Sequence, residues 1–212
     1  MIWIFGDSLS TAYNLADKSL GWPDILGKKL NSSYKNFAQR SADNFFIYSS
    51  YYENLKDIKK DDIVIIGWSH HNRKSFVLDR DNSTHIDNIV NGKVFKVKDK
   101  EFFRSQNPVN DNRQKMLSLL PKVTGNAYYD TWFNNYYSEY EQLRHLQCYQ
   151  DSVTLNCPGR YYPYFFNDVL NWIKDNNVAI SQNDQHFNKD GHRLWAKKLL
   201  EEINDVPNNR II

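Results

Sequence analysis

The sequence predicts an α/β protein with a mostly parallel sheet of about five strands and helices on both faces, a three-layer α/β/α arrangement. Apolar runs of strand length alternate with segments of helical periodicity through residues 1–73. The runs at 2–5 and 63–66 are apolar throughout, which is typical of strands buried on both faces, and each ends at a glycine. We expect residues 1–212 to form one domain, with an insertion at about 74–121 after the third strand.

The first half of the chain contains five expected elements. They are strands at 2–5, 34–38 and 61–67, and helices at 22–30 and 42–52. Trp22, Ile25, Leu26 and Leu30 recur at helical spacing, and Pro23 occupies a first-turn position that proline favours. The order strand, helix, strand, helix, strand indicates parallel pairing.

The insertion contains a clear β-hairpin signal. Asn91-Gly92 separates two extended arms at 84–90 and 93–98, and this dipeptide is the preferred two-residue hairpin turn. The arms carry many charges, so the hairpin is expected at the surface. Its position leaves two possibilities open: it forms a rim of the site, or it is a solvated decoration without contact to substrate.

The second half is expected to hold a helix at 126–150, a strand at 161–166, a helix at 167–174, a short strand at 178–180 and a final helix at 189–203. Aromatic residues in the first of these helices recur every three to four positions. They are Tyr129, Trp132, Phe133, Tyr136, Tyr137 and Tyr140. Burial against the sheet is the ordinary cause of this period, and a sugar-stacking platform is the alternative.

Composition excludes several classes of partner. The net charge is +2, from 27 basic and 25 acidic residues, so a nucleic-acid partner, which needs clustered positive charge, is not expected. No apolar run approaches the ~18 residues of a transmembrane helix, so membrane insertion is not expected. The apolar run at 1–5 is too short for a signal-peptide core, which predicts a cytoplasmic protein. Neither zinc-ligand spacing nor a phosphate-binding Gly-x-x-x-x-Gly-Lys loop occurs, so no metal or cofactor is expected.

The two ends of the chain carry the residues best suited to chemistry. In parallel sheets, ligands bind at the carboxyl ends of strands. Ser8 follows the first strand in Gly6-Asp7-Ser8, where a serine hydroxyl can be exposed at that edge, although Asp and Ser are also common helix caps. Asp184 and His186 precede the last helix; a nucleophilic serine needs such a base and such an orienting carboxylate, but a loop histidine near an aspartate is also ordinary.

Taken together, G-D-S-L-S after the first strand and D-x-H-x-N-x-x-G-H before the last helix resemble the SGNH (GDSL) hydrolase superfamily. The resemblance implies a flavodoxin-like fold and a serine esterase or acyl hydrolase that works through an acyl-enzyme. It implies that Ser8 is the nucleophile, His186 the general base and Asp184 its partner. Many members place the aspartate three residues before the histidine, where Asn183 stands here; the spacing of Asp184 is also familiar in the family. The implied substrate is a small-molecule or glycan ester, including carbohydrate O-acetyl esters.

The middle blocks of the family are altered in this chain. Asn36 is retained, but Ser41 stands where the family has a glycine whose N–H contacts the oxyanion. In the third block, Gly67-Trp68-Ser69-His70 replaces Gly-x-Asn-Asp, so Ser69 occupies the place of the donor asparagine. The implied oxyanion donors are therefore Ser8, Ser41 and Ser69, with His70, Asn72 or Arg73 as replacements for the third.

The segment 68–73 lies at the carboxyl end of the strongest strand, which favours a role in substrate binding for Trp68, His70, Asn72 and Arg73. The alternative is that Trp68 packs in the core and that His71 and Arg73 are solvated. Asp7 and His192 are interpreted as structural residues. The altered third block also leaves open a different class of function, a non-catalytic binding or structural module on the same fold.

Overall fold

The central sheet has four strands, all parallel, in the order β2-β1-β3-β8. The computed structural model describes residues 1–13, 15–40, 42–78, 87–90, 93–96, 115–119 and 138–205. The sheet strands are β1 (Ile2–Phe5), β2 (Tyr34–Asn36), β3 (Ile63–Trp68) and β8 (Arg160–Phe165). In chain order this is the 2-1-3-4 arrangement of a flavodoxin-like sheet, in which ligands bind at the carboxyl edge near β1 and β3.

The two-residue period of the strands divides the core into two parts. Ile2 and Ile4 of β1 contact one cluster, and Trp3 and Phe5 contact the other. β3 follows the same alternation, and all of its residues are buried. Because both faces of these strands are apolar, both must be covered by helices.

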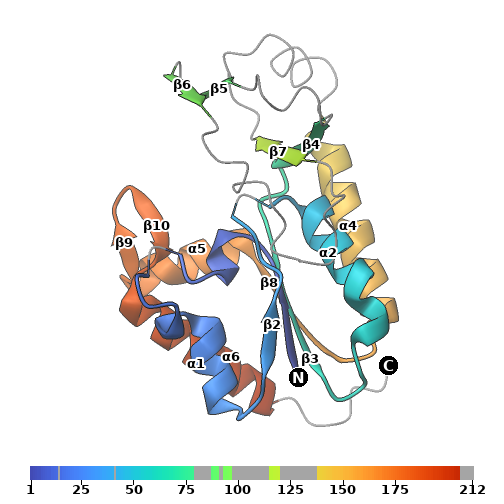
Figure 1. Cartoon of the computed structure of the whole chain (residues 1–212), viewed down its shortest axis with the longest axis vertical. Coiled ribbons are helices and arrows are strands. Elements are labelled where there is room, and N and C mark those ends of the chain that lie inside the picture. The colour runs from blue at the N-terminus through green and yellow to red at the C-terminus, as the bar shows by residue number, and fades with distance from the viewer. Residues whose placement is uncertain are drawn as a thin grey trace.

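Helices cover the two faces of the sheet, so the predicted α/β three-layer fold is confirmed (Figure 1). One layer contains α1 (Trp22–Lys29), α5 (Phe166–Asp175) and α6 (Lys189–Asp205). The other contains α2 (Asn44–Asn54) and α4 (Glu139–Asn156).

The predicted fifth strand forms, but it does not join the central sheet, so the prediction of about five strands in that sheet is wrong. The segment expected at 178–180 forms β9 (Ala179–Ser181), which pairs antiparallel with β10 (Asp184–Phe187) in a separate two-stranded sheet. The chain turns back within a few residues, which permits only antiparallel pairing, whereas a parallel strand requires a crossover connection.

The helix predicted at 126–150 begins later than expected. Ser138 is its N-cap, with Oγ accepting the Glu141 N–H at 3.3 Å, so α4 starts at Glu139. The predicted stripe from Tyr129 to Tyr137 lies outside the described residues, and Tyr140 is 67% exposed rather than buried.

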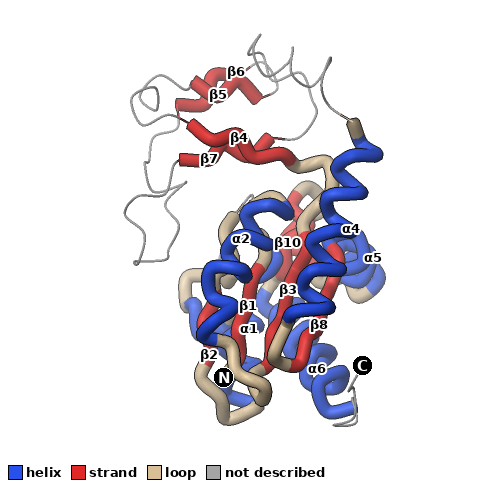
Figure 2. Tube along the Cα trace, turned by 90° about the vertical axis from the view of Figure 1, so that its right-hand side faces the viewer, coloured by secondary structure: helices blue, strands red, loops and turns tan. Residues whose placement is uncertain are grey.

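The insertion after β3 contains the predicted hairpin. β5 (Asp87–Val90) pairs antiparallel with β6 (Lys93–Lys96), and Val90 lies opposite Lys93. A second antiparallel pair joins β4 (Lys74–Leu78) to β7 (Lys115–Leu119). Figure 2 shows both pairs beyond the end of the central sheet at which β3 leads into β4.

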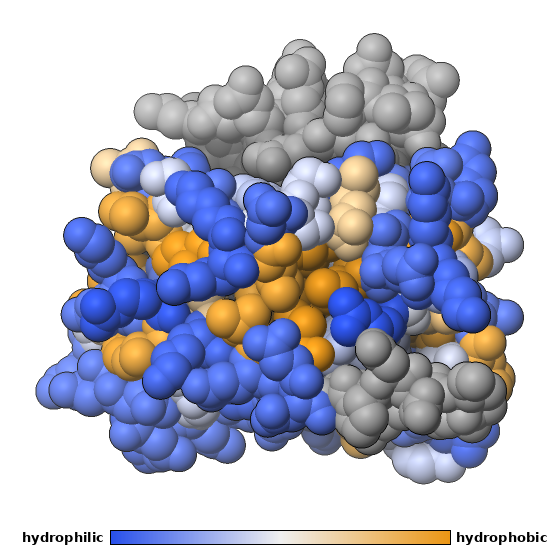
Figure 3. Space-filling model, turned by 90° about the horizontal axis from the view of Figure 1, so that it is seen from below, coloured by the Kyte–Doolittle hydropathy of each residue, from blue (hydrophilic) through white to orange (hydrophobic). Residues whose placement is uncertain are grey.

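The opposite end of the molecule, where the strands begin, has a different character. Figure 3 views this end and shows apolar side chains gathered in the middle of a hydrophilic surround. Within the described ranges, each helix is too short or too polar to cross a bilayer.

Candidate active site

Ser8 lies in a tight turn directly after β1. Asp7 caps the 3₁₀ turn Ser8–Ser10, because its Oδ1 accepts the Leu9 N–H at 3.0 Å. Gly6 is required here: a Cβ at this position would lie 1.9 Å from Ser10 Oγ. Ser10 in turn is held by a 2.5 Å hydrogen bond between its Oγ and the Tyr164 hydroxyl. Hydrogen bonds made by Asp7, before Ser8, and by Ser10, after it, therefore hold the turn that presents Ser8.

The structure brings Ser8, His186 and Asp184 into one hydrogen-bonded chain. His186 Nε2 lies 2.8 Å from Ser8 Oγ, although the two residues are 178 positions apart. His186 Nδ1 lies 2.6 Å from Asp184 Oδ1, and the same oxygen accepts the His186 backbone N–H at 3.1 Å. Both residues belong to β10, so the short β9–β10 hairpin carries the imidazole to the end of β1.

The state of Asp184 determines the tautomer of His186. Burial raises the pKa of Asp184, but hydrogen bonds from His186 outweigh that effect and hold the pKa below its usual value. A carboxylate only accepts hydrogen bonds, so Nδ1 of the neutral imidazole carries the proton. The lone pair of Nε2 then faces the Ser8 hydroxyl, which is the arrangement that a general base needs.

A stack on the face of His186 was not anticipated from the sequence. The Tyr13 ring lies parallel to the imidazole, with centroids 3.9 Å apart and planes 16° apart. The Arg40 guanidinium lies 4.1 Å from the centroid of the same Tyr13 ring. The Tyr13 ring therefore contacts both the His186 imidazole and the Arg40 guanidinium. In the sequence, the signal for this stack is an aromatic residue, Tyr13, three positions after the G-D-S-L-S motif.

This stack predicts a positioning role for Tyr13. Tyr13→Ala is expected to lower kcat for ester hydrolysis about threefold to tenfold, because stacking of this kind contributes about 0.5–1.5 kcal/mol. Tyr13→Phe keeps the ring and should behave like the wild type. Steady-state kinetics of the two variants, beside their thermal midpoints, test this; equal losses in both would mean that the hydroxyl, rather than the stack, matters.

Ser69 is not placed as an oxyanion donor. Its Oγ donates to Asp7 Oδ2 at 3.0 Å, and its backbone N–H donates to Asn44 Oδ1 at 2.8 Å. Asn44 Nδ2 also donates to the Ser69 carbonyl at 3.1 Å. Both donors of Ser69 are therefore occupied, which corrects the expectation from its position in the third block. Its role in this structure is to tie the end of β3 to the Ser8 turn.

Trp68 also differs from the sequence expectation. It is the last residue of β3, is 1% exposed, and donates its indole N–H to the Tyr161 hydroxyl at 2.9 Å. The strand continues one residue past Gly67, and the pleat turns this side chain into the core. Trp68 is therefore a packing residue and is not available to a substrate.

The other residues of this segment lie in a partly buried turn after β3. The Asn72 backbone N–H donates to His70 Nδ1 at 3.1 Å. The His70 ring stacks on His71, with centroids 4.7 Å apart. Arg73 follows, with one nitrogen, Nη1, fully buried and without a hydrogen-bond partner. His70 and Arg73 thus remain candidates for substrate binding.

Of the three predicted oxyanion donors, Ser8 alone stays a candidate within the described residues. Its backbone N–H donates to no other group in that part of the chain, unlike the N–H groups of Leu9 and Ser10. Ser41 lies outside the described residues. The side-chain amide of Asn36 is not placed as an oxyanion donor, because its Nδ2 donates to the Ser10 carbonyl at 2.8 Å.

His192 has the character of a structural residue. It is 1% exposed, and its Nδ1 accepts the Trp22 backbone N–H at 3.3 Å. Burial, with smaller contributions from the charges of His186 and Lys18, lowers the pKa of His192 to about 4. Protonation of Nδ1 would also place its N–H donor against the N–H donor of Trp22, which is unfavourable. The folded protein therefore holds this imidazole neutral.

The pKa of His192 predicts a pH-dependent stability. The folded pKa of about 4 lies below the ordinary value of 6.5, so unfolding takes up a proton as the pH falls between these values. The free energy of unfolding should fall by about 3 kcal/mol between pH 7 and pH 4 on account of this group. Urea titrations at several pH values test this: His192→Gln should lose that share of the slope, while His145→Gln on the exposed face of α4 should keep it.

The described residues offer no group of three or more His, Cys, Asp or Glu side chains that could hold a metal ion.

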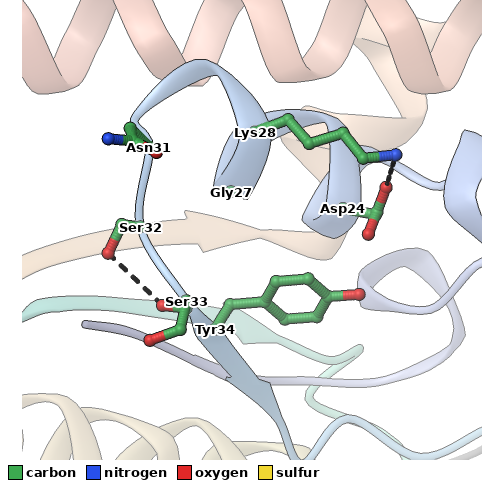
Figure 4. A pocket seen from close by; sticks show the side chains of 7 residues that line it. All are labelled: Asp24, Gly27, Lys28, Asn31, Ser32, Ser33 and Tyr34. Atoms are coloured by element: carbon green, nitrogen blue, oxygen red, sulfur yellow. Dashed lines mark hydrogen bonds and ion pairs between the residues drawn. The ribbon is translucent and has the colours of Figure 1, made fainter.

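A surface hollow of about 400 Å³ lies at the amino end of the sheet (Figure 4). It is lined by Asp24, Gly27, Lys28, Asn31, Ser32, Ser33 and Tyr34. Tyr34 pairs with Ile2 at the start of β1, whereas Ser8 follows the end of β1, so this hollow is separate from the candidate site.

The chain matches no protein-family model and no curated protein. It is similar to the crystal structure of a member of the lipolytic protein G-D-S-L family from Veillonella parvula DSM 2008, with a TM-score of 0.44 and 12% sequence identity over 97% of this chain and 98% of that one. It is also similar to a protein of the G-D-S-L family from Desulfitobacterium hafniense DCB-2, with a TM-score of 0.42 and 13% identity over 94% of this chain and 97% of that one.

Proposed function

We propose that this chain is a serine hydrolase that cleaves a carboxylic ester through an acyl-enzyme. The observation that carries the proposal is the unbroken hydrogen-bonded chain from Asp184 through His186 to Ser8, with distances of 2.6 and 2.8 Å. Residues used only as a helix cap or a loop carboxylate would have no reason to meet in this order. The matching tautomer of His186 supports the same role.

Acylation follows from the roles of these three side chains. Ser8 Oγ attacks the ester carbonyl while His186 Nε2 takes the hydroxyl proton. Asp184 stays ionised, holds the ring by its Nδ1–H and stabilises the imidazolium that forms. His186 then gives the proton to the leaving alcohol, the C–O bond to the alcohol breaks, and the acyl group remains on Ser8.

The tetrahedral oxyanion needs hydrogen-bond donors that point at the former carbonyl oxygen of the ester. The unused backbone N–H of Ser8 is one donor, and Ser41 is proposed as a second on the resemblance of its position to the family's second block. With Ser69 occupied by Asp7 and Asn44, the side-chain donor of the third block is missing. Loss of one such donor lowers kcat by about 10²–10³-fold, so we expect a slower enzyme than one with three donors.

Deacylation repeats the chemistry with water. His186 removes a proton from water, the resulting hydroxide attacks the acyl-Ser8 carbonyl, and the proton returns to Ser8 Oγ as the acid leaves. Each step uses side chains of the chain itself.

Covalent labelling tests this proposal directly. The wild-type protein is incubated with a fluorophosphonate probe, and peptide mass spectrometry locates the adduct; hydrolysis of para-nitrophenyl acetate is measured in parallel. We expect one adduct, on Ser8, and loss of ester hydrolysis in step with labelling. His186→Ala should slow labelling strongly because the base is gone.

A folded wild-type protein that neither takes the probe nor cleaves the ester would contradict the proposal. Labelling of another serine at the same rate as Ser8 would contradict it as well. Either result would favour the non-catalytic alternative, a binding or structural module on this fold.

A further inference from the structure

The turn after β3 contains a partly buried arginine, Arg73. Arg73 forms no ion pair with any carboxylate in the described ranges, and its Nη1 is buried with no hydrogen-bond partner. The side chain as a whole is partly exposed, so the guanidinium lies at the edge between the protein interior and solvent. A desolvated cation of this kind is costly unless an anion meets it.

Asp7 is a buried carboxylate whose charge interacts with that of Arg73, but both of its oxygens accept hydrogen bonds from other groups. Its Oδ1 accepts the Leu9 N–H, and its Oδ2 accepts the Ser69 hydroxyl. Burial raises the pKa of Asp7, and the charge of Arg73 offsets only part of that rise. The two groups attract each other electrostatically, but Nη1 of the guanidinium has no hydrogen-bond partner.

His70 adds a second donor to the same turn. Its Nδ1 accepts the Asn72 N–H, so in the neutral ring Nε2 carries the proton. Burial and the charges of His71 and Arg73 lower the pKa of His70, so the ring is neutral at pH 7. Nε2 has no hydrogen-bond partner among the described residues. The turn thus presents a positive charge at Arg73 and a donor at His70, and the carboxylate of Glu139 beside it bonds to His71 at 2.8 Å.

This turn lies beside the nucleophile. β3 is the neighbour of β1 in the sheet, and the Ser69 hydroxyl links it to Asp7, which precedes Ser8. A substrate whose carbonyl reaches Ser8 would thus extend one of its two halves toward Arg73. A guanidinium there is suited to an oxyanion group, because its planar set of N–H donors matches the oxygens of such a group.

We propose that Arg73, with His70 beside it, binds an anionic group of the substrate, so that the natural substrate is an ester carrying a carboxylate, phosphate or sulfate near the bond that is cleaved. This inference rests on the proposed function, since it assigns the substrate class of the same site. Arg73 is a substrate-binding residue in this proposal and takes no part in proton transfer.

Two matched pairs of esters test the substrate class. In the first pair the charge is on the acyl side, para-nitrophenyl hemisuccinate against para-nitrophenyl butyrate. In the second it is on the alcohol side, para-acetoxybenzoate against phenyl acetate. The wild type should prefer the anionic member of at least one pair about tenfold or more in kcat/KM, as expected for hydrogen bonds to a charged group.

Arg73→Gln should remove that preference, because kcat/KM for the anionic ester should fall about tenfold more than kcat/KM for its neutral partner. Arg160→Gln is the matched control, because Arg160 opens β8 opposite Ile63, at the other end of the sheet, and carries the same charge. It should keep the preference. As a second readout, succinate but not neutral succinamide should slow labelling of Ser8 by the fluorophosphonate, and only when Arg73 is present.

Three results would overturn the inference while leaving the esterase intact. They are a wild type without preference for either anionic ester, equal loss on charged and neutral esters in Arg73→Gln, which would indicate an oxyanion role, and no protection by succinate. Failure of the esterase proposal is distinguishable, since Ser8 would then remain unlabelled in every variant. If Arg73→Gln does not fold, wild-type selectivity and succinate protection decide the question.

Discussion

Replacing Ser8 with alanine is expected to abolish covalent labelling and to lower kcat for ester hydrolysis by about 10⁴–10⁶-fold. The variant removes one oxygen and with it the atom that attacks the carbonyl. The turn should persist, because Asp7 Oδ1 still accepts the Leu9 N–H and Tyr164 still holds Ser10. Residual hydrolysis would come from substrate binding and backbone donors alone. Active-site titration and steady-state rates measure both effects.

Ser10→Ala is the matched control for this prediction. Ser10 lies in the same 3₁₀ turn and is also buried, but its hydroxyl bonds to Tyr164 and not to His186. We expect Ser10→Ala to lose stability and still to be labelled at Ser8. A Ser8→Ala protein that hydrolyses ester at wild-type rate would assign the chemistry to another group.

Much of the site was predictable because the residues that follow the strands of a parallel sheet all lie at the same edge of that sheet. A buried apolar run that ends at Gly6 places the next residues at the carboxyl edge of a parallel sheet, so Ser8 had to lie at that edge. The short spacing of Asp184 and His186 allowed one to hold the other. That their hairpin reaches Ser8 was implied by the family resemblance, and periodicity alone contained no such information.

The third block was harder to predict, since it depends on competition for hydrogen bonds. Ser69 stands where a donor is expected, but Asp7 and Asn44 take its two donors. Neither partner is close to Ser69 in sequence, so the pattern could not reveal the competition. Trp68 differs from expectation for a simpler reason: β3 ends at Trp68, one residue past the predicted end at Gly67, and the two-residue period points the indole inward.

The local sequence pattern also did not determine which sheet β9 joins. The apolar segment that became β9 has the same composition as a sheet strand. Its pairing was decided by the return of the chain into β10 within a few residues, which the strand propensity of the segment does not reveal. That departure matters for function, since the hairpin it creates carries the base.

Asp184→Asn is the second large effect that the geometry predicts, with a loss of about 10⁴-fold in kcat. The carboxamide keeps the shape of the side chain, but its nitrogen is a donor where the imidazole Nδ1–H needs an acceptor. If the amide turns that nitrogen to the ring, Nδ1 must become the acceptor, and the proton moves to Nε2, facing Ser8. The ring is then present, correctly placed, and unable to take the serine proton.

The matched control is Asp190→Asn in the first turn of α6. Asp190 pairs with Arg193 at 3.4 Å in an exposed i,i+3 contact and should change kcat less than about twofold, since such surface pairs contribute little. Loss of activity with retained folding in Asp184→Asn, and not in Asp190→Asn, would mean that the carboxylate acts through the tautomer of His186. If both variants kept full activity, the 2.6 Å contact between Asp184 and His186 would be a structural tie of β10, and the orientation of the base would have to come from the Tyr13 stack instead.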